Sequence, residues 1–269
     1  MSDRYAKYQR LTFDRPSPKL LEIIFNGVGR GNACDSRGHL EMSEIWNDVA
    51  EDPEINAAIV RGPGDTFCSG GHMDLVENLG EDFNQTLQGY TEARGIVYNM
   101  LNCNKPIVSA IRGAAAGAGL AMALLADITV ASKTARINDA HCKLGMPAGD
   151  HAVIIWPLLC GLAKAKYHLF LNDTMSGEEA ERIGLVSICV EDSQTYDKAR
   201  EIGVRLAGSA QTAIRWSKYA LNNWLRMAGP AFDISLLMSS IAFYGPDVKE
   251  GVAALREKRK PSFSAQSPL

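Results

Sequence analysis

Residues 112–132 read RGAAAGAGLAMALLADITVAS, and this stretch decides the expected fold of the chain. It continues the apolar run 106–111 and reads as a strand, a turn of glycine and alanine, a small-residue helix over 117–125 and a second strand over 127–131. Short apolar runs separated by helices are typical of strands buried on both faces of a parallel sheet. Right-handed crossovers would stack such units side by side, so the stretch predicts an α/β core.

The same alternation extends toward the N-terminus. Two runs, 9–14 and 20–25, are predicted to form a strand hairpin, and 57–61 is predicted to be a further buried strand. Asp35 can cap the helix that separates the hairpin from that strand. A long helix with one apolar face is expected over 83–101.

Toward the C-terminus the pattern becomes helical. Ser176 and Glu179 form a predicted capping box, in which each side chain bonds the backbone N–H of the other, and its helix ends before a strand over 185–190. Only helical periodicity follows. We therefore expect an α/β core over residues 1–192 and a C-terminal helical region over 193–269.

Composition is typical of one soluble globular protein. Hydrophobic residues make up 46% and charged residues 22% of 269 residues, which suits a single large core. A net charge of −3, with one dense basic run at 256–260, argues against a nucleic-acid partner. No apolar run reaches the length of about eighteen residues typical of a membrane span, and the start MSDRYAKYQR lacks a signal-peptide core. We expect a cytoplasmic protein with no membrane partner.

The cysteines suggest no metal or disulfide framework. All six are scattered without a CxxC pair or a Cys/His cluster at zinc spacing, so reduced and mostly buried thiols are expected, and no metal site. Cys142, beside His141, is a candidate nucleophile, but nothing in the sequence marks its thiol as activated.

Two glycine-rich turns carry the first functional prediction. FCSGGHM at 67–73 and GAAAGAG at 113–119 each follow a predicted buried strand and lead into a helix. Backbone N–H groups at a helix start lack partners and attract negative charge, so two such turns side by side could form an oxyanion hole. The alternative is that glycine and alanine only permit tight turns. Neither GxxxxGK[ST] nor GxGxxG after the first strand is present, which disfavours a phosphate-binding loop.

Ionisable side chains are concentrated just after these turns. His141, Asp150 and His151 lie within eleven positions, and an imidazole with a reference pKa near 6.5 can act as base or acid around neutrality. The alternative for His141 is a satisfied loop histidine, and for Asp150 a helix N-cap. His151 should point about 100° away from Asp150 around the helix, and a structural role is expected for it.

Four motifs occur in order along the chain: FCSGG, RGAAAGAGLAMALLAD, MSGEEAERIGLV and FYGPDVKEGVAALREKRKPSF. Over nearly the whole chain they resemble the crotonase (enoyl-CoA hydratase/isomerase) superfamily. The resemblance implies an α/β, ClpP/crotonase-like fold: a spiral of ββα repeats with a C-terminal helical trimerisation region. It also implies a homotrimer or a hexamer built as a dimer of trimers.

The resemblance also implies roles for single residues. The backbone N–H groups of Gly71 and Ala118 would be the two oxyanion donors. Ser69, Phe243 and Lys258 would contact coenzyme A, with a contact across a subunit boundary as one option and a plain surface charge as the alternative for Lys258. Coenzyme A would then be part of the substrate, and no separate cofactor is expected.

This chain departs from the family pattern at the acid/base positions. A typical hydratase of the family uses two glutamates, and the corresponding positions here are Ala121 and His141. Asp150 could orient the imidazole and stabilise its cationic form. His72 occupies a position where many relatives have aspartate, and it is either a third catalytic polar group at the acyl pocket or a residue near a helix N-cap in contact with solvent.

One branch of the superfamily is similar around these residues. The spacing of His141 and Asp150, with AGDHAVIIWP, resembles β-diketone hydrolases related to 6-oxocamphor hydrolase. A further histidine of that branch corresponds to Gly119 here, and this chain keeps the CoA-type C-terminal motif that the branch largely lacks.

Three functions are consistent with the sequence. The first is an enzyme acting on an acyl-CoA thioester through an oxyanion-stabilised enolate, with His141 and Asp150 in place of the glutamate pair. The second is a hydrolase that cleaves a carbon–carbon bond of a β-diketone. The third is a crotonase fold that binds acyl-CoA without catalysis.

Overall fold

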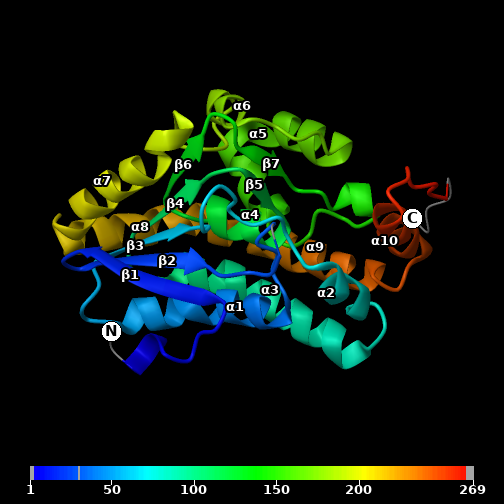
Figure 1. Ribbon diagram of the computed structural model, residues 1–269, viewed down its shortest axis with the longest axis horizontal. Helices are drawn as coiled ribbons and strands as arrows, with labels where there is room; N and C mark the ends of the chain where they lie inside the picture. Colours follow the sequence, from blue (N-terminus) through cyan, green and yellow to red (C-terminus); the bar gives the residue numbers. More distant parts are fainter. Residues whose placement is uncertain (1–2, 30, 265–269) are drawn as a thin grey trace.

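A computed structural model describes residues 3–29 and 31–264, and it contains a six-stranded sheet (Figure 1). The strands lie in the order β1 (Leu11–Ser17), β2 (Leu20–Phe25), β3 (Ala57–Arg61), β4 (Ile107–Ile111), β6 (Ile128–Ser132) and β8 (Ile188–Val190). β1 and β2 are antiparallel, and every later neighbour is parallel. The predicted hairpin and the predicted parallel sheet are both confirmed.

Helices cover both faces of this sheet (Figure 1). α1 (Ser36–Glu51) and α3 (Phe83–Asn102) pack on one face, where the fully buried Trp46 belongs to the main hydrophobic core. α7 (Thr195–Ala207) packs on the other face, where Ile202 joins a second cluster with the strands. Burial on both faces explains why β3 and β4 are continuous apolar runs rather than alternating ones.

A second, two-stranded sheet was not expected from the sequence. β5 (Ala114–Ala116) and β7 (Arg136–Asn138) pair in parallel, each directly after a strand of the large sheet. α4 (Gly117–Leu124) then follows β5, so the chain from β4 to α4 forms a ββα unit, in agreement with the predicted spiral repeat. Strands of three residues are too short for a period-two pattern to show, which is why they were missed.

The predicted caps are partly confirmed. The Asp35 carboxylate accepts a hydrogen bond from the Gly38 N–H at 2.8 Å at the start of α1. Ser176 Oγ likewise accepts from the Glu179 N–H at 3.2 Å before α6 (Gly177–Arg182). The reciprocal half of the predicted capping box is wrong, because both Glu179 carboxylate oxygens accept from the Arg182 guanidinium at 2.6 Å instead.

α5 (Ala152–Leu171) contains a break at Gly161, which has φ 77° and ψ 153°. Among the described residues it is the one helix long and apolar enough, by length and composition, to cross a membrane. A span needs about 20 residues of continuous helix, and the break at Gly161 leaves neither half that long.

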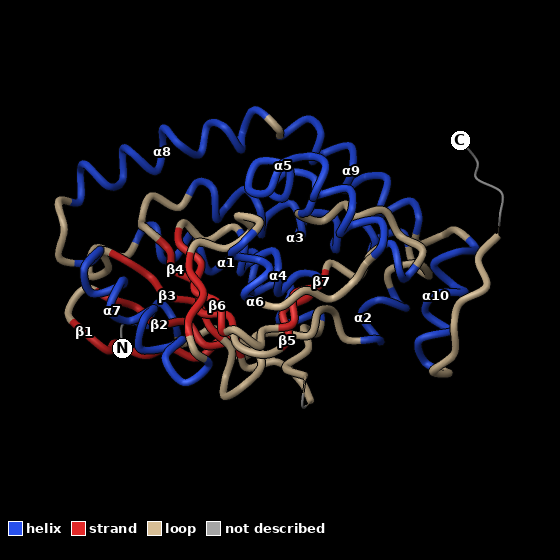
Figure 2. The backbone as a smooth tube through the Cα atoms, turned by 90° about the horizontal axis from the view of Figure 1, so that it is seen from above, coloured by secondary structure: helices blue, strands red, loops and turns tan. Residues whose placement is uncertain are grey.

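The C-terminal helices pack against elements from the middle of the sequence. α8 (Gln211–Met227) runs along the outside and leads into α9 (Gly229–Ala242), as Figure 2 shows, and α10 (Pro246–Arg256) closes the described region. α10 packs against the 3-10 turn η2 (Cys142–Leu144). Contact is close, since a Cβ on Gly251 of α10 would lie 2.4 Å from the Leu144 carbonyl oxygen. The predicted boundary at residue 192 stays a prediction, although α7 is part of the sheet core.

The remaining elements are short. They are the 3-10 turns η1 (Asp3–Tyr5) and η3 (Asp192–Gln194), and the helix α2 (Met73–Asn78) that follows the first glycine-rich turn.

Candidate active site

One cavity of about 430 Å³ joins both glycine-rich turns to the ionisable stretch. Its wall is formed by the turn before α2, by α3, by the start of α4, by η2 and by α9 and α10. The charged and titratable side chains on the wall are His39, Tyr90, Asp139, His141, Lys143, Asp150 and Arg259. The rest of the lining is mostly apolar, as is usual for a small-molecule site.

The two glycine-rich turns lie side by side, as predicted. Cys68 of the first turn forms a parallel bridge with Ala115 of the second, and Cys68 N donates to the Ala114 carbonyl at 2.9 Å. Ala118 is the second residue of α4, so no preceding turn of helix can accept its N–H. Gly71 and Ala118 both line the cavity, and neither backbone N–H has a hydrogen-bond partner among the described residues.

Gly119, in the second turn, packs directly against Cys68 of the first turn. A Cβ at this position would lie 2.4 Å from Cys68 Cβ and 2.7 Å from Cys68 Sγ, far inside van der Waals contact. The position that corresponds to a further histidine in β-diketone hydrolases therefore has no room for a side chain here. The absence of that histidine is a packing requirement of this turn.

His141 lies between two carboxylates. Its Nδ1 is 3.0 Å from Asp139 Oδ1, and its Nε2 is 3.4 Å from Asp150 Oδ2. The side chain is 12% exposed and faces the cavity. The predicted proximity of His141 and Asp150 is thus present, while Asp139, two residues before His141, was not singled out in the sequence.

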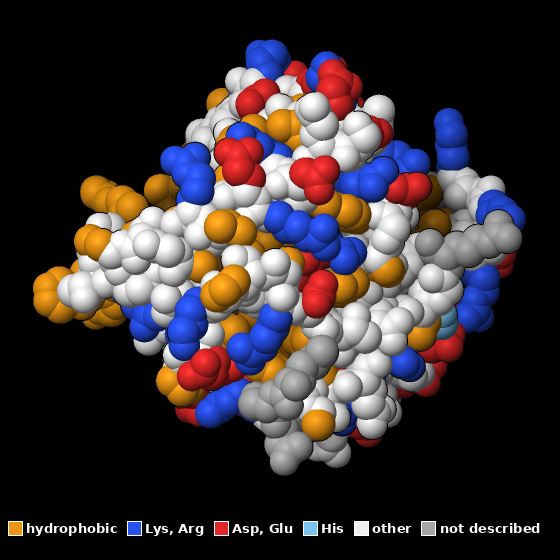
Figure 3. Space-filling model, turned by 60° about the vertical axis from the view of Figure 1, so that its left-hand side comes forward, with side chains coloured by type: hydrophobic (Ala, Val, Ile, Leu, Met, Phe, Trp, Pro, Cys, Tyr) orange, Lys and Arg blue, Asp and Glu red, His pale blue; other side chains and the backbone are white. Residues whose placement is uncertain are grey.

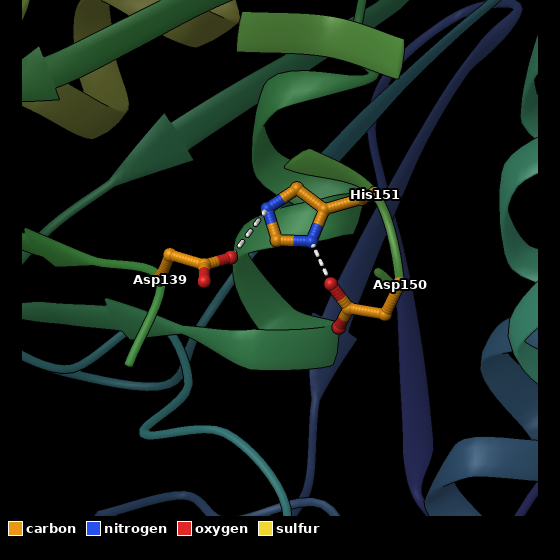
Figure 4. A group of neighbouring side chains, drawn as sticks. All are labelled: Asp139, Asp150 and His151. Atoms are coloured by element: carbon orange, nitrogen blue, oxygen red, sulfur yellow. Dashed lines mark hydrogen bonds and ion pairs between the residues drawn. The ribbon is translucent and has the colours of Figure 1, made fainter. Parts of the chain in front are cut away.

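Asp150 also contacts His151, which the sequence placed on another side of the helix (Figure 4). His151 is the N-cap residue of α5 and is non-helical, with φ −162°. Its fully buried ring can therefore turn back, and its Nδ1 lies 2.5 Å from Asp150 Oδ1. The expected 100° separation is wrong for this reason. Asp150 itself makes no capping hydrogen bond to α5, so the N-cap alternative for it is not realised.

A strained residue brings Asp139 and His141 together. Ala140 has φ +67°, in the left-handed region that a residue with a Cβ seldom adopts, at a cost of about 1 kcal/mol. The bend allows Asp139 Oδ1 to accept from both the backbone N–H of His141, at 3.3 Å, and its ring.

The electrostatics of the cluster favour charge separation. Burial would lower the pKa of His141, but the carboxylates of Asp139 and Asp150 outweigh it and raise that pKa to about 10. Burial would likewise raise the pKa of Asp150, but the imidazoles of His141 and His151 hold it well below its usual range. The two shifts act in the same direction, because each favours the charged form of its group.

A second histidine on the cavity wall was missed in the sequence. His39 of α1 lies with its Nδ1 2.6 Å from Glu92 Oε2 of α3, and both side chains are buried. Gln88 donates to the other Glu92 oxygen at 2.7 Å. The signal available was a histidine and a glutamate inside two apolar helix faces, where polar side chains are uncommon.

Two of the three residues predicted to contact coenzyme A line the cavity, and the third does not. Ser69 and Phe243 line the cavity, whereas Lys258 is exposed and lies outside it. Arg259 lines the cavity in its place, and its guanidinium is paired with Glu250 at 2.5 Å and 2.9 Å. The C-terminal motif thus forms part of the wall of its own chain's cavity.

The structure does not bring His72 to the other predicted catalytic residues. Its side chain is 42% exposed, lies 3.5 Å from Asp74 Oδ2 and does not line the cavity. Ala121 is buried in the core. Burial and the charge of Asp139 raise the pKa of the Cys142 thiol, which disfavours a thiolate nucleophile there.

Three residues of this region have the chemistry of metal ligands. Asp139, Asp150 and His151 each offer one ligand atom, and these atoms lie within 4.8 Å of one another (Figure 4). The hydrogen bond between Asp150 and His151 already uses two of these groups.

The chain is similar to proteins of one family along its length. A model of the enoyl-CoA hydratase/isomerase family matches residues 17–266. The crotonyl-CoA hydratase of Syntrophomonas wolfei subsp. wolfei is 28% identical over 264 residues, which cover 95% of this chain and 98% of that protein.

Solved structures agree with this similarity. An enoyl-CoA hydratase/isomerase from Mycobacterium paratuberculosis superposes with a TM-score of 0.86 at 26% identity, covering 91% of this chain and 97% of that one. A β-diketone hydrolase from the cyanobacterium Anabaena sp. PCC 7120, bound to (S)-3-oxocyclohexyl acetic acid, superposes with a TM-score of 0.81 at 25% identity, covering 91% and 98%. The predicted crotonase-type fold is confirmed, and the chain belongs to the enoyl-CoA hydratase/isomerase family.

Proposed function

We propose that this enzyme acts on an acyl-CoA thioester and stabilises its enolate with the backbone N–H groups of Gly71 and Ala118. One observation carries the proposal: two backbone donors that have no partner in the described part of the chain, from adjacent turns, line the same cavity as the His141 imidazole. An enolate oxygen bears the negative charge that such preorganised donors stabilise. A titratable group beside it can exchange the proton of the α-carbon.

Coenzyme A fits this proposal as part of the substrate. Relatives are named as hydratases of CoA thioesters, and Ser69 and Phe243 line the cavity where the C-terminal motif reaches it. The proposal needs no separate cofactor and no metal ion. Lys258, which is exposed, is proposed as a contact for the phosphate-bearing end of the ligand outside the cavity.

The acid/base work falls to His141 with Asp150 in this proposal. Ala121, at one of the two family glutamate positions, has only a methyl group and cannot exchange a proton. Addition of water between two glutamates is therefore not available to this chain. His141 transfers the proton or activates water, and Asp150 stabilises its cationic form. His72 would act only as a polar group near the entrance, because it does not line the cavity.

A second candidate is cleavage of a carbon–carbon bond in a β-diketone. His141 and Asp150 lie 3.4 Å apart, and the chain superposes on a β-diketone hydrolase at 25% identity. In that reaction water attacks one carbonyl, and the leaving enolate occupies the oxyanion hole. The packed Gly119 position and the C-terminal motif on the cavity wall favour the CoA thioester over a free diketone.

We also propose assembly as a homotrimer, or as a hexamer of two trimers, in the cytoplasm. Large apolar side chains of α5 and α8 are exposed on a single chain, which is costly unless another surface covers them. The most exposed are Leu162, Phe170, Leu171, Trp216, Tyr219, Leu221, Trp224 and Met227. Figure 3 shows hydrophobic side chains protruding at one edge of the molecule, and acidic and basic side chains interspersed over the face in view.

A substrate panel tests the function. Purified protein is incubated with crotonyl-CoA, other acyl-CoAs and cyclic β-diketones, with products detected by mass spectrometry and coenzyme A binding measured by calorimetry. Turnover of a CoA thioester that is lost in His141→Gln supports the proposal. Turnover of diketones alone supports the second candidate. Binding of CoA thioesters without any turnover would identify a non-catalytic acyl-CoA binder and refute both.

A further inference from the structure

The cavity has an exposed mouth and a buried inner end. Ser69, Lys143 and Arg259 line the mouth, and all three are exposed to solvent. Ala93 of α3 and Leu236 of α9 line the inner end, where they are only 8% and 4% exposed. The CoA part of a thioester is large and polar and needs the open mouth, so the acyl group occupies the inner end between α3 and α9.

α3 and α9 lie side by side and run in opposite directions (Figure 1). Arg94 of α3 contacts Asp233 of α9 at 3.2 Å. Eight positions earlier in α3, the Thr86 hydroxyl lies 2.7 Å from the hydroxyl of Tyr244, just after the end of α9. Tyr90 is one helical turn from each of these α3 residues, on the same face. It therefore lies opposite the middle of α9, which also lines the cavity.

The hydroxyl groups on the cavity wall away from the mouth are of two kinds. Those of Thr86, Thr174 and Ser240 make hydrogen bonds within the protein. Those of Tyr90 and Ser239 make none with the described residues. The fold therefore uses the first kind, whereas the second kind is available to a molecule in the cavity.

Ser239 is the better evidence of the two, because it is only 5% exposed. A serine inside a helix commonly donates to the carbonyl one turn earlier, and Ser240 does so to Leu236 at 2.9 Å. Ser239, the preceding residue of the same helix, does not. A Cβ on Gly149 would lie 2.7 Å from Ser239 Cβ, so this serine packs beside the turn that carries Asp150. A buried hydroxyl without a partner is costly unless water or a ligand bonds to it.

We propose that Tyr90 and Ser239 are specificity-determining residues that bind a second oxygen atom of the acyl group, carried as a ketone or as a hydroxyl. This inference rests on the proposed function, because it names the class of acyl-CoA that the site selects. Each side chain can donate its O–H to such an oxygen, and each can accept from a substrate hydroxyl.

A plain alkyl chain is disfavoured at the same place. It would displace water from both hydroxyl groups without replacing the hydrogen bonds of that water, which lowers affinity. The neighbouring wall is apolar, with Leu79, Ala93 and Leu236. An oxygen at the wrong carbon of the chain would face these residues and lose its own hydrogen bonds. The site should therefore select for the position of the oxygen as well as for its presence.

Calorimetry with matched CoA thioesters tests the inference on the wild-type protein. The probes are hexanoyl-CoA and its 3-oxo, 5-oxo, 3-hydroxy and 6-hydroxy derivatives, which share one chain length and one CoA part. We expect one or more of the oxygenated probes to bind about tenfold more tightly than hexanoyl-CoA, the factor typical of one added hydrogen bond. A probe that the protein turns over is compared by kcat/KM instead. Equal values for all five probes would overturn the inference.

Two substitutions assign the preference to the two hydroxyl groups. Tyr90→Phe and Ser239→Ala each remove one oxygen and keep the rest of the side chain, so each should reduce the preference for the oxygenated probe, and the double variant should abolish it. Affinity for hexanoyl-CoA should change less than about twofold. The controls are Tyr98→Phe, whose hydroxyl bonds Asp233 at 3.1 Å outside the cavity, and Ser209→Ala at an exposed serine. Both should leave the preference unchanged.

The remaining outcomes separate this inference from the proposed function. A preference that persists in the double variant would mean that other groups bind the oxygen, which overturns the assignment. CoA thioesters that bind or turn over without any preference would overturn this inference and leave the proposed function intact. If no CoA thioester binds or reacts, the proposed function fails, and this inference fails with it.

Discussion

Substitution of Gly119 by alanine should disturb the oxyanion turn by a calculable amount. The added Cβ would lie 2.4 Å from Cys68 Cβ, and Cys68 cannot retreat easily because its backbone is bridged to Ala115. Overpacking of this kind costs about 1–3 kcal/mol. Alanine in place of glycine in a helix stabilises the folded state by up to about 1 kcal/mol through its higher helix propensity. With this gain subtracted in full, we expect a net loss of up to about 2 kcal/mol in the free energy of unfolding.

A double-mutant cycle isolates the clash. Cys68→Ala removes only Sγ and leaves the 2.4 Å contact, whereas Cys68→Gly removes the contact itself. In urea unfolding, Gly119→Ala should be destabilising in the wild-type and Cys68→Ala backgrounds but neutral or stabilising with Cys68→Gly, a coupling of about 1–3 kcal/mol. kcat should fall as well, because Ala118 is adjacent. Equal costs of Gly119→Ala in all backgrounds would refute the packing argument.

Three other predictions concern the rest of the site and the surface. The pKa of His141 is raised from its unfolded value near 6.5 to about 10, so its contribution to stability is complete below pH 6.5 and is lost as the pH rises to 10. Urea unfolding should show wild type losing up to about 1.4 kcal/mol per pH unit relative to His141→Gln in that window, and parallel curves would contradict it. Glu92→Gln removes the charge beside His39 and should lower kcat by about tenfold in the steady-state assay with little change in melting temperature, whereas full activity would exclude a role for this pair. Trp224→Glu places a charge on the exposed face of α8, so light scattering should show the mass falling from three chains to one of 29.2 kDa, and an unchanged mass would place the interface elsewhere.

The strands and helices of the large sheet could be predicted because their sequence signals are local. The continuous apolar run that became β3 has the predicted bounds 57–61, since a strand buried on both faces needs no polar alternation. The break at Gly161 was predictable for a similar reason, because a helix tolerates glycine poorly. The short strands β5 and β7 were not, since they are defined only by their pairing across the chain.

The site could be predicted only in part. His141 and Asp150 were found because their residue types suggest proton chemistry and because the family resemblance places them at acid/base positions. Asp139 was missed because its contact with His141 depends on the left-handed backbone conformation of Ala140. An alanine in the sequence does not predict that conformation. The turn of His151 toward Asp150 depends on its non-helical φ. His39 and Glu92 lie on two different helices and are 53 positions apart in the sequence.

The closure of the cavity by α9 and α10 has a consequence for how the protein is made. A ribosome synthesises the cluster of Asp139, His141, Asp150 and His151 well before the wall residues Phe243 and Arg259 that complete the cavity. Domains begin to fold during synthesis at about 5–20 residues per second. For several seconds the nascent chain therefore lacks the part of the cavity wall that α9 and α10 supply, and the cavity can close only after these helices have been synthesised.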